Sequence, residues 1–272
     1  MIELRDSMPM TESTPPFPWP PRLSAIIAVL GLIVWPGSRM QANAANGMTS
    51  EKTLPLSTTV ILYDGSLGGL PNTQGMLYQT SSLEVTESFA NGATTLDTTA
   101  QRSDHAGYFP VLAPTLDRAV GYLVNFTAQV ITETHVSNDR AGFSLIVLSS
   151  DKQGIELGFW TDEIWAQEDG TAEPPSGTLF THAEGAVFDT ATGLITYTLT
   201  VLGDTYTLSA ASLPILSGPL RDYTPFTGPI DPYEIPNFIF LGDDTSSARA
   251  AIRLSFVSVA TMNRVYLPLI QR

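Results

Sequence analysis

The chain has 272 residues, with 27 acidic and 13 basic side chains and a formal net charge of −14 at pH 7. This acidity excludes nucleic acid as a partner, because binding to phosphates needs a basic surface. The sequence has no cysteine, which excludes disulfides, thiolate metal ligands and cysteine nucleophiles. Only 15% of the residues are charged, and the abundance of threonine, serine and glycine is typical of strands and turns rather than of helices.

The first 45 residues have the pattern of an export signal. Arg22 precedes an apolar run at 23–35 that is too short to span a bilayer comfortably, and small residues at 42–44 form an Ala-x-Ala cleavage site. We therefore expect residues 1–45 to be a cleaved signal peptide with a long leader, and the protein to be secreted, extracellular or displayed on the cell surface. An uncleaved membrane anchor is the alternative interpretation. Apart from this segment, we expect no contact with a membrane.

Short strands separated by turns follow the signal segment. A polar lead-in at 46–58 precedes the first of them, and Gly, Pro and Asn residues mark the turns between the next ones. The strand-like segments in this part of the chain are 59–63, short pieces within 81–104, 108–112 and 120–131.

The segment 138–167 is predicted to form the centre of one sheet. Residues 143–148 are apolar on both faces of a strand, as expected where each face is covered. After a polar turn, residues 155–160 alternate between an apolar face and a face that carries Glu156 and Trp160. We expect the most buried sheet here and, beside it, the surface most suited to a ligand.

The remaining sequence completes an all-β pattern. Residues 195–208 predict a hairpin that turns at a Gly-Asp pair, and strands are expected at 238–241 and 250–259. Between them, the proline-rich segment 217–236 predicts a long surface loop that is either ordered by packing or binds a ligand.

Together these segments predict a single sandwich of two antiparallel sheets over residues 59–260. We expect its first and last strands to lie side by side. Residues 261–272 follow as a short C-terminal tail, whose role the sequence leaves open along with the oligomeric state.

Four sequence blocks resemble one known family. They are LYDGSLGGLPNTQG, NDRAGFSLIVLSSDKQGIELGFW, FDTATGLITYTLTVLGDTYTLSA and PNFIFLGDDTSSA. They resemble the bacterial choice-of-anchor Y domain and, more widely, the concanavalin-A-like (laminin-G-like) jelly rolls, over about residues 60–260. The resemblance implies a secreted or surface-displayed jelly-roll sandwich and implies no particular ligand. The chain departs from anchored members, because its apolar stretch at 266–270 is too short to span a membrane.

Candidate ligand-binding residues lie in and around the central segment. Trp160 and Trp165 are candidates for stacking on sugar rings, and Glu156 and Glu163 for accepting hydrogen bonds from hydroxyl groups. Filling of the core is the alternative role for both indoles. Arg140 precedes the central strand and is expected either to contact the ligand at the sheet edge or to pair with a carboxylate.

A calcium site is the cofactor that the sequence leaves open. Asp243 and Asp244 form an acidic turn that offers oxygen ligands to Ca²⁺. Hydrogen bonds within the turn explain the same two residues equally well.

No catalytic residue is predicted. Glycosidases need two carboxyl groups that flank the scissile bond, whereas Glu156 is followed on its face of the strand by Gly158 and Trp160. The leading hypothesis is a non-enzymatic module that binds carbohydrate or another surface polymer. The alternatives are a structural or adhesive envelope protein that acts through protein–protein contacts and, less favoured, a polysaccharide hydrolase or lyase.

Overall fold

The computed structural model describes residues 58–171, 178–228 and 231–262. The predicted signal segment, nearly all of the lead-in and nearly all of the C-terminal tail lie outside these ranges. The described residues all belong to one compact unit built from strands and short 3₁₀ turns. None of its helices is long and apolar enough to cross a membrane.

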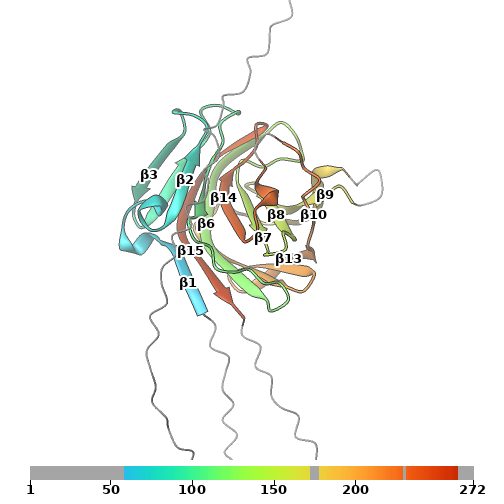
Figure 1. Ribbon diagram of the computed structural model, residues 1–272. Helices are drawn as coiled ribbons and strands as arrows, with labels where there is room; N and C mark the ends of the chain where they lie inside the picture. The colour runs from blue at the N-terminus through green and yellow to red at the C-terminus, as the bar shows by residue number, and fades with distance from the viewer. Residues whose placement is uncertain (1–57, 172–177, 229–230, 263–272) are drawn as a thin grey trace, which may run out of the picture. The chain divides into compact units, whose positions relative to one another are not determined.

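Sheet A, the larger of two antiparallel sheets, has eight strands (Figure 1). Its order is β13-β12-β11-β6-β15-β4-β3, and β1 pairs with part of β15. The bounds of its strands are β1 (Thr58–Asp64), β3 (Thr86–Ala90), β4 (Ala93–Asp97), β6 (Tyr122–His135), β11 (Ile195–Leu202), β12 (Thr205–Ala210), β13 (Leu213–Pro219) and β15 (Ala248–Thr261).

Sheet B has seven strands in the order β10-β9-β8-β7-β14-β5-β2. The bounds of its strands are β2 (Met76–Thr80), β5 (Ala106–Pro110), β7 (Ser144–Leu148), β8 (Gly154–Phe159), β9 (Glu163–Asp169), β10 (Leu179–Val187) and β14 (Phe238–Asp243). The 3₁₀ turns are η1 (Gly65–Leu67), η2 (Pro71–Thr73) and η3 (Pro232–Glu234).

The predicted two-sheet sandwich is confirmed. β1 pairs with β15, as expected of the first and last strands. The predicted central strand is β7, which lies between β14 and β8, and the predicted hairpin is β11 with β12. The sequence did not predict β10 or β13, and most of β2 falls in the Gly- and Pro-containing segment 67–78, which the sequence predicts as a loop. β10 is half-buried along most of its length and shifts register twice, so it shows no alternation, and β13 contains prolines and a glycine.

The inner faces of the two sheets form the main core. In β6, every second residue from Tyr122 to Val130 is buried, as the alternating sequence predicts. Phe126 in this strand stacks on Tyr197 of β11 with ring centroids 5.0 Å apart, and it meets Phe159 of β8 edge-on at 5.9 Å. These ring contacts hold sheet A against sheet B. Truncating a core phenylalanine to alanine costs about 3–5 kcal/mol, so each such ring contributes substantially to stability.

A smaller apolar cluster covers part of the outer face of sheet B, the face turned away from sheet A. The segments 220–228 and 231–237, here called the strap, lie on this face (Figure 1). Tyr223 and Tyr233 of the strap pack on Ile146 of β7. The proline-rich segment predicted as a loop therefore begins within β13 and is then ordered by packing.

Tyr223 ties the strap into sheet B. Its hydroxyl donates a hydrogen bond of 2.8 Å to the Gln167 carbonyl and accepts one of 3.2 Å from the Glu156 amide. The strands β8 and β9 pair directly only from Leu157 to Phe159. The phenol thus bridges the position at which the two strands separate, and it satisfies backbone groups that would otherwise be buried without partners.

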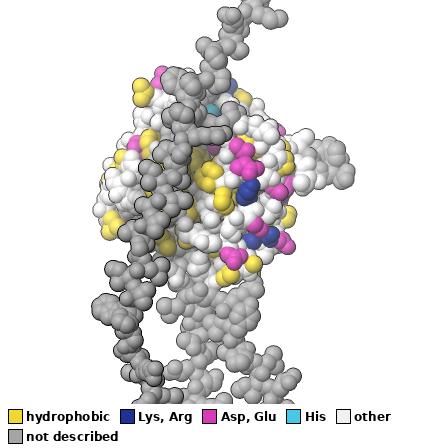
Figure 2. Space-filling model, in the orientation of Figure 1, with side chains coloured by type: hydrophobic (Ala, Val, Ile, Leu, Met, Phe, Trp, Pro, Cys, Tyr) yellow, Lys and Arg dark blue, Asp and Glu magenta, His cyan; other side chains and the backbone are white. Residues whose placement is uncertain are grey.

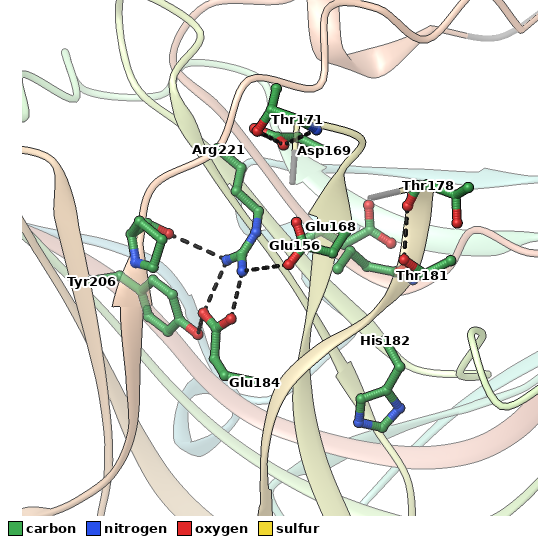
Figure 3. A network of polar contacts seen from close by, with 12 residues as sticks. Glu156, Glu168, Asp169, Thr171, Thr178, Thr181, His182, Glu184, Tyr206 and Arg221 are labelled. Carbon is green, nitrogen blue, oxygen red and sulfur yellow. Dashed lines mark hydrogen bonds and ion pairs between the residues drawn. The ribbon is translucent and has the colours of Figure 1, made fainter. Parts of the chain in front are cut away.

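Arg221 anchors the start of the strap between the two sheets (Figure 3). Its guanidinium donates hydrogen bonds of 3.0 Å to Glu184 of β10 and 3.4 Å to Glu168 of β9, and Tyr206 of β12 donates to Glu184 at 2.7 Å. Its backbone pairs with Gly154 of β8. Burial acts to lower the pKa of Arg221, but the Glu184 carboxylate outweighs it and raises that pKa. This network joins edge strands of both sheets to the strap.

Candidate functional site

The structure gathers nearly all of the predicted site residues at the outer face of sheet B. Glu156 lies on β8 and Trp165 on β9, and both side chains belong to this face because their neighbours in the strands fill the main core. The residues brought together here are Arg140, Glu156, Trp160, Glu163, Trp165 and Asp244. Asp243 lies elsewhere.

Trp160 and Trp165 stack with two histidines. His135 lies flat against Trp160 with ring centroids 4.1 Å apart, and His182 lies flat against Trp165 at 4.3 Å. The two indoles are 5.6 Å apart. Trp165 is fully buried, whereas Trp160 is half-buried. In this arrangement Trp165 has no open face for a sugar ring, and stacking on a sugar stays a prediction for Trp160.

Glu163 and Arg140 both contact other parts of the protein. Oε1 of Glu163 lies 3.1 Å from Nε2 of His182. Arg140 donates a hydrogen bond to the Phe180 carbonyl, and its guanidinium lies 5.3 Å from the centre of the Phe180 ring. The indole of Trp160 donates a 2.9 Å hydrogen bond to the Arg140 carbonyl. These contacts hold the turn before β7 over β9 and β10.

Glu156 meets an acidic partner, Asp244, that follows the end of β14. Tyr233 of the strap donates a hydrogen bond to Glu156, and the Asp244 carboxyl group lies close enough to Glu156 and Ser144 to interact with both. We call this site the polar niche, formed by Ser144, Glu156, Gly158, Trp165 and Asp244. Spacing along β8 predicts no acidic partner for Glu156, because the partner comes from a different strand.

Burial determines the protonation of this pair. Glu156 is 3% exposed, and burial raises its pKa well above the usual value; the charge of Asp244 adds to the increase, while the hydrogen bond from Tyr233 opposes it. Burial also raises the pKa of Asp244. Two carboxyl groups in contact cannot both ionise without repulsion, so the pair retains a proton that an exposed carboxyl would release. The pair can therefore both donate and accept hydrogen bonds.

Asp243 lies between the sheets, away from the niche. Its carboxylate accepts hydrogen bonds of 2.6 Å from the Thr98 hydroxyl and 3.1 Å from the Thr245 amide, and burial raises its pKa to about 9. Asp243 and Asp244 thus point in opposite directions. The described residues contain no cluster of three or more His, Asp or Glu side chains that could hold a metal ion. The predicted calcium site gains no support from these contacts.

Beyond the strap, the outer face of sheet B carries a row of phenylalanines. Phe238 and Phe240 of β14 are stacked with centroids 6.5 Å apart, and Phe109 of β5 lies 6.1 Å from Phe238. All three are half-buried, and Leu77, the partner of Phe109 on β2, is 46% exposed. We call these four residues the aromatic platform. Figure 2 shows hydrophobic side chains gathered in this region, beside acidic ones.

Polar side chains border the platform. The ring of Phe240 covers Gly107 so closely that a Cβ atom there would lie 2.4 Å from it. Gln79 is the partner of Gly107 on β2, and His105 lies just before β5, within electrostatic reach of Asp244. Burial lowers the pKa of His105 against the attraction of that carboxyl. The platform therefore ends in amide, imidazole and carboxyl groups, which the sequence did not single out because they come from three separate strands.

No family model matches the chain, and no curated protein matches it in sequence. Solved structures are similar to it in fold. A carbohydrate esterase from the Shiga toxin-encoding bacteriophage phi24B has a TM-score of 0.50 at 12% sequence identity, covering 76% of this chain and 100% of that one. The chain has a concanavalin-A-like jelly-roll fold.

Two weaker likenesses are a Bacillus subtilis protein of unknown function and a glucanase. The first has a galectin-like fold, with a TM-score of 0.47 and 11% identity over 76% of this chain and 100% of that one. The second, the endo-1,3-beta-glucanase from Streptomyces sioyaensis, has a TM-score of 0.44 and 12% identity over 81% of this chain and 100% of that one. At these identities the comparisons bear on the fold alone.

Proposed function

We propose that the protein is a secreted, non-enzymatic jelly-roll module that binds a carbohydrate or another surface polymer on the aromatic platform. The observation that carries this proposal is the row of half-exposed rings with polar side chains at its border. A sugar ring has apolar C–H faces and hydroxyl groups around its edge, so an aromatic surface with a few polar groups beside it suits both features. We also propose, from the four sequence blocks, that the chain is related to choice-of-anchor Y domains.

The arrangement of the carboxyl groups favours binding over glycoside hydrolysis. Glycosidases hold their two carboxyl groups about 5–10 Å apart, on either side of the scissile bond. Glu156 and Asp244 instead interact with each other, and Tyr233 donates a hydrogen bond to Glu156. The phage esterase shares the fold at 12% identity, which does not extend its activity to this chain.

A structural or adhesive role is the second candidate. The exposed side chain of Leu77 and the half-exposed rings beside it would also suit an apolar protein partner. This alternative predicts self-association or attachment to another protein through the same platform, and no glycan ligand.

The proposal is tested by a binding assay. The purified protein is added to a panel of glycans and polysaccharides, first with calcium and then with a chelator. We expect at least one to bind, and Phe238→Ala to weaken the binding at least about tenfold, since a central aromatic contact contributes about 1.4 kcal/mol or more. Phe89→Ala is the matched control, because Phe89 is a half-buried phenylalanine on β3 of sheet A. Unfolding curves show whether each variant is folded.

The outcomes separate the two candidates. A protein that binds no member of the panel and self-associates in a Phe238-dependent manner would contradict the glycan proposal and favour the adhesive one. Binding that both substitutions weaken equally, with both variants folded, would place the ligand away from the platform.

A further inference from the structure

The polar niche and its neighbour on β9 contain buried polar atoms without partners. Trp165 is fully buried and its Nε1–H group makes no hydrogen bond, and Gln167 is 1% exposed and its Oε1 atom accepts none within the described residues. Buried polar groups are almost always hydrogen-bonded, because leaving them unpaired is costly. One unpaired donor and one unpaired acceptor on the same face of β9 therefore point to a missing polar partner.

The unpaired N–H group lies beside the carboxyl pair. A Cβ atom added at Gly158 would be 2.9 Å from both Cε2 and Cζ2 of Trp165, and Nε1 is bonded to Cε2. Gly158 is the ladder partner of Ser144 and lies two residues after Glu156 on the same face. The N–H edge of the indole thus lies over Gly158, which is paired with Ser144 and stands two residues from Glu156.

The chemistry of the niche matches a neutral hydroxyl group. The indole N–H is a donor and disfavours a cation, whereas the carboxyl pair disfavours an anion. A hydroxyl group donates one hydrogen bond and accepts up to two, so it can accept from Trp165 and donate to Glu156 or to the amide oxygen of Gln167. The carboxyl pair retains a proton, so it can either donate a hydrogen bond to the hydroxyl group or accept one from it.

The niche borders the aromatic platform through β14. Asp244 follows this strand, which carries the platform residue Phe240, and His105 lies just before the neighbouring strand β5; both side chains are half-buried. A sugar ring stacked on Phe240 would reach the niche only with a group that extends beyond the ring. In a hexose, the hydroxymethyl group is the substituent whose hydroxyl stands on an extra carbon atom.

We propose that the polar niche binds the primary hydroxyl group of a hexose whose ring lies on the aromatic platform. This inference rests on the proposed glycan-binding function and names the feature of the ligand that is recognised. Trp165 donates to the hydroxyl oxygen, and the hydroxyl hydrogen is accepted by the carboxyl pair.

The indole N–H signals in an NMR titration test this inference. The probes are the methyl glycosides of galactose, glucose and mannose and their 6-deoxy counterparts, added to the ¹⁵N-labelled protein. We expect the hexosides to shift the Trp165 indole signal and the 6-deoxy compounds to leave it in place. Trp160 serves as the internal control, because its N–H is already bonded to the Arg140 carbonyl. Because the chain has four tryptophans, Trp160→Phe and Trp165→Phe each identify one of the two signals.

Glu156→Gln and Glu234→Gln form a matched pair of variants. Glu156 belongs to the niche, whereas Glu234 lies on the exposed side of the strap and pairs with Lys152. We expect Glu156→Gln to weaken hexoside binding severalfold, because a neutral amide accepts a weaker hydrogen bond than a carboxyl pair that shares one proton, and to leave 6-deoxy binding unchanged. Glu234→Gln should leave both unchanged.

The possible results distinguish failure of this inference from failure of the proposed function. If the hexosides and the 6-deoxy compounds shift the platform signals equally while the Trp165 signal stays fixed, the niche holds only water and the inference is overturned, with the glycan-binding function intact. If no glycoside shifts any signal and no panel glycan binds, the proposed function and this inference both fail.

Discussion

Replacing Arg221 should destabilise the fold far more than replacing any exposed arginine. Arg221 is 5% exposed and joins Glu184 and Glu168 of sheet B to the strap, while Tyr206 of sheet A bonds to the same Glu184 (Figure 3). Removing one partner of a buried ion pair costs about 3–5 kcal/mol, because the other charge stays buried without a partner. The Glu184 side chain is 27% exposed, so water can replace part of the lost contact. We therefore expect Arg221→Met to cost about 3 kcal/mol.

Arg118→Met is the matched control. Arg118 also bonds two carboxylates, Asp151 and Asp204, but its side chain is 26% exposed and theirs are 46% and 89% exposed. Exposed ion pairs contribute about 0–1 kcal/mol. Urea unfolding of both variants and the parent protein at pH 7 measures the two costs. The midpoint of Arg221→Met should fall well below that of Arg118→Met.

The pH dependence of this cost supplies a second check. Burial acts to raise the pKa of Glu184, but the hydrogen bond from Arg221 outweighs it and lowers that pKa. Such a group stabilises the fold above its unfolded pKa, near 4.3, and this contribution is lost as the pH falls through the folded value. The difference between Arg221→Met and the parent should therefore shrink below about pH 4. Equal costs for the two arginine variants at pH 7 would show that burial of the Arg221 ion pairs adds nothing to stability.

Three further predictions concern buried polar groups and close packing. Burial raises the folded pKa of Asp243 to about 9. The protonated carboxyl therefore favours the fold at low pH, and this contribution is lost as the pH rises from about 4 toward 9. Asp243→Asn should flatten the decline in melting temperature over that range. Tyr223→Phe leaves the Glu156 amide and the Gln167 carbonyl unpaired and should cost about 2–4 kcal/mol in urea unfolding; a cost below about 1 kcal/mol would show that water replaces the hydroxyl. Gly142→Ala would place a Cβ atom 2.2 Å from the backbone of β15, and we expect at least about 3 kcal/mol of destabilisation, or no soluble protein; an unchanged melting temperature would contradict the packing.

The fold was predictable because most of its strands carry their own signal. The alternation in β6 and the residues of β7, apolar on both faces, are local patterns that indicate a strand and its burial without reference to the rest of the chain. β10 lacks such a signal, since its side chains are half-buried along most of the strand and its pairing with β9 is irregular. It becomes a strand through its neighbours.

The site was predictable only in part, because it is assembled across strands. The sequence placed Glu156 and Trp160 on one face of a strand; in the structure Glu156 lies on β8, and Trp160 directly follows this strand and contacts Trp165. The partner carboxyl of Asp244 comes from the end of β14, and the burial of Trp165 results from His182 on β10 and from the turn before β7. Spacing along one strand contains no information about such contacts.

The platform shows the same limit. Phe238 and Phe240 alternate with core residues of β14, and nothing in that alternation says that their face is left partly open. The opening exists because the strap covers the neighbouring strand β7 with Tyr223 and Tyr233 and ends beside β14. The position of the strap in turn depends on Arg221 and its partners on two sheets.

The proposed function requires a glycan to lie on the aromatic platform. Backbone amide shifts, followed during titration with the tightest ligand from the glycan panel, show where the glycan binds. We expect the largest changes in β2, β5 and β14, on both sides of Phe109 and Phe240. Changes confined to the outer face of sheet A at saturation, with the platform strands unmoved, would contradict the proposed function.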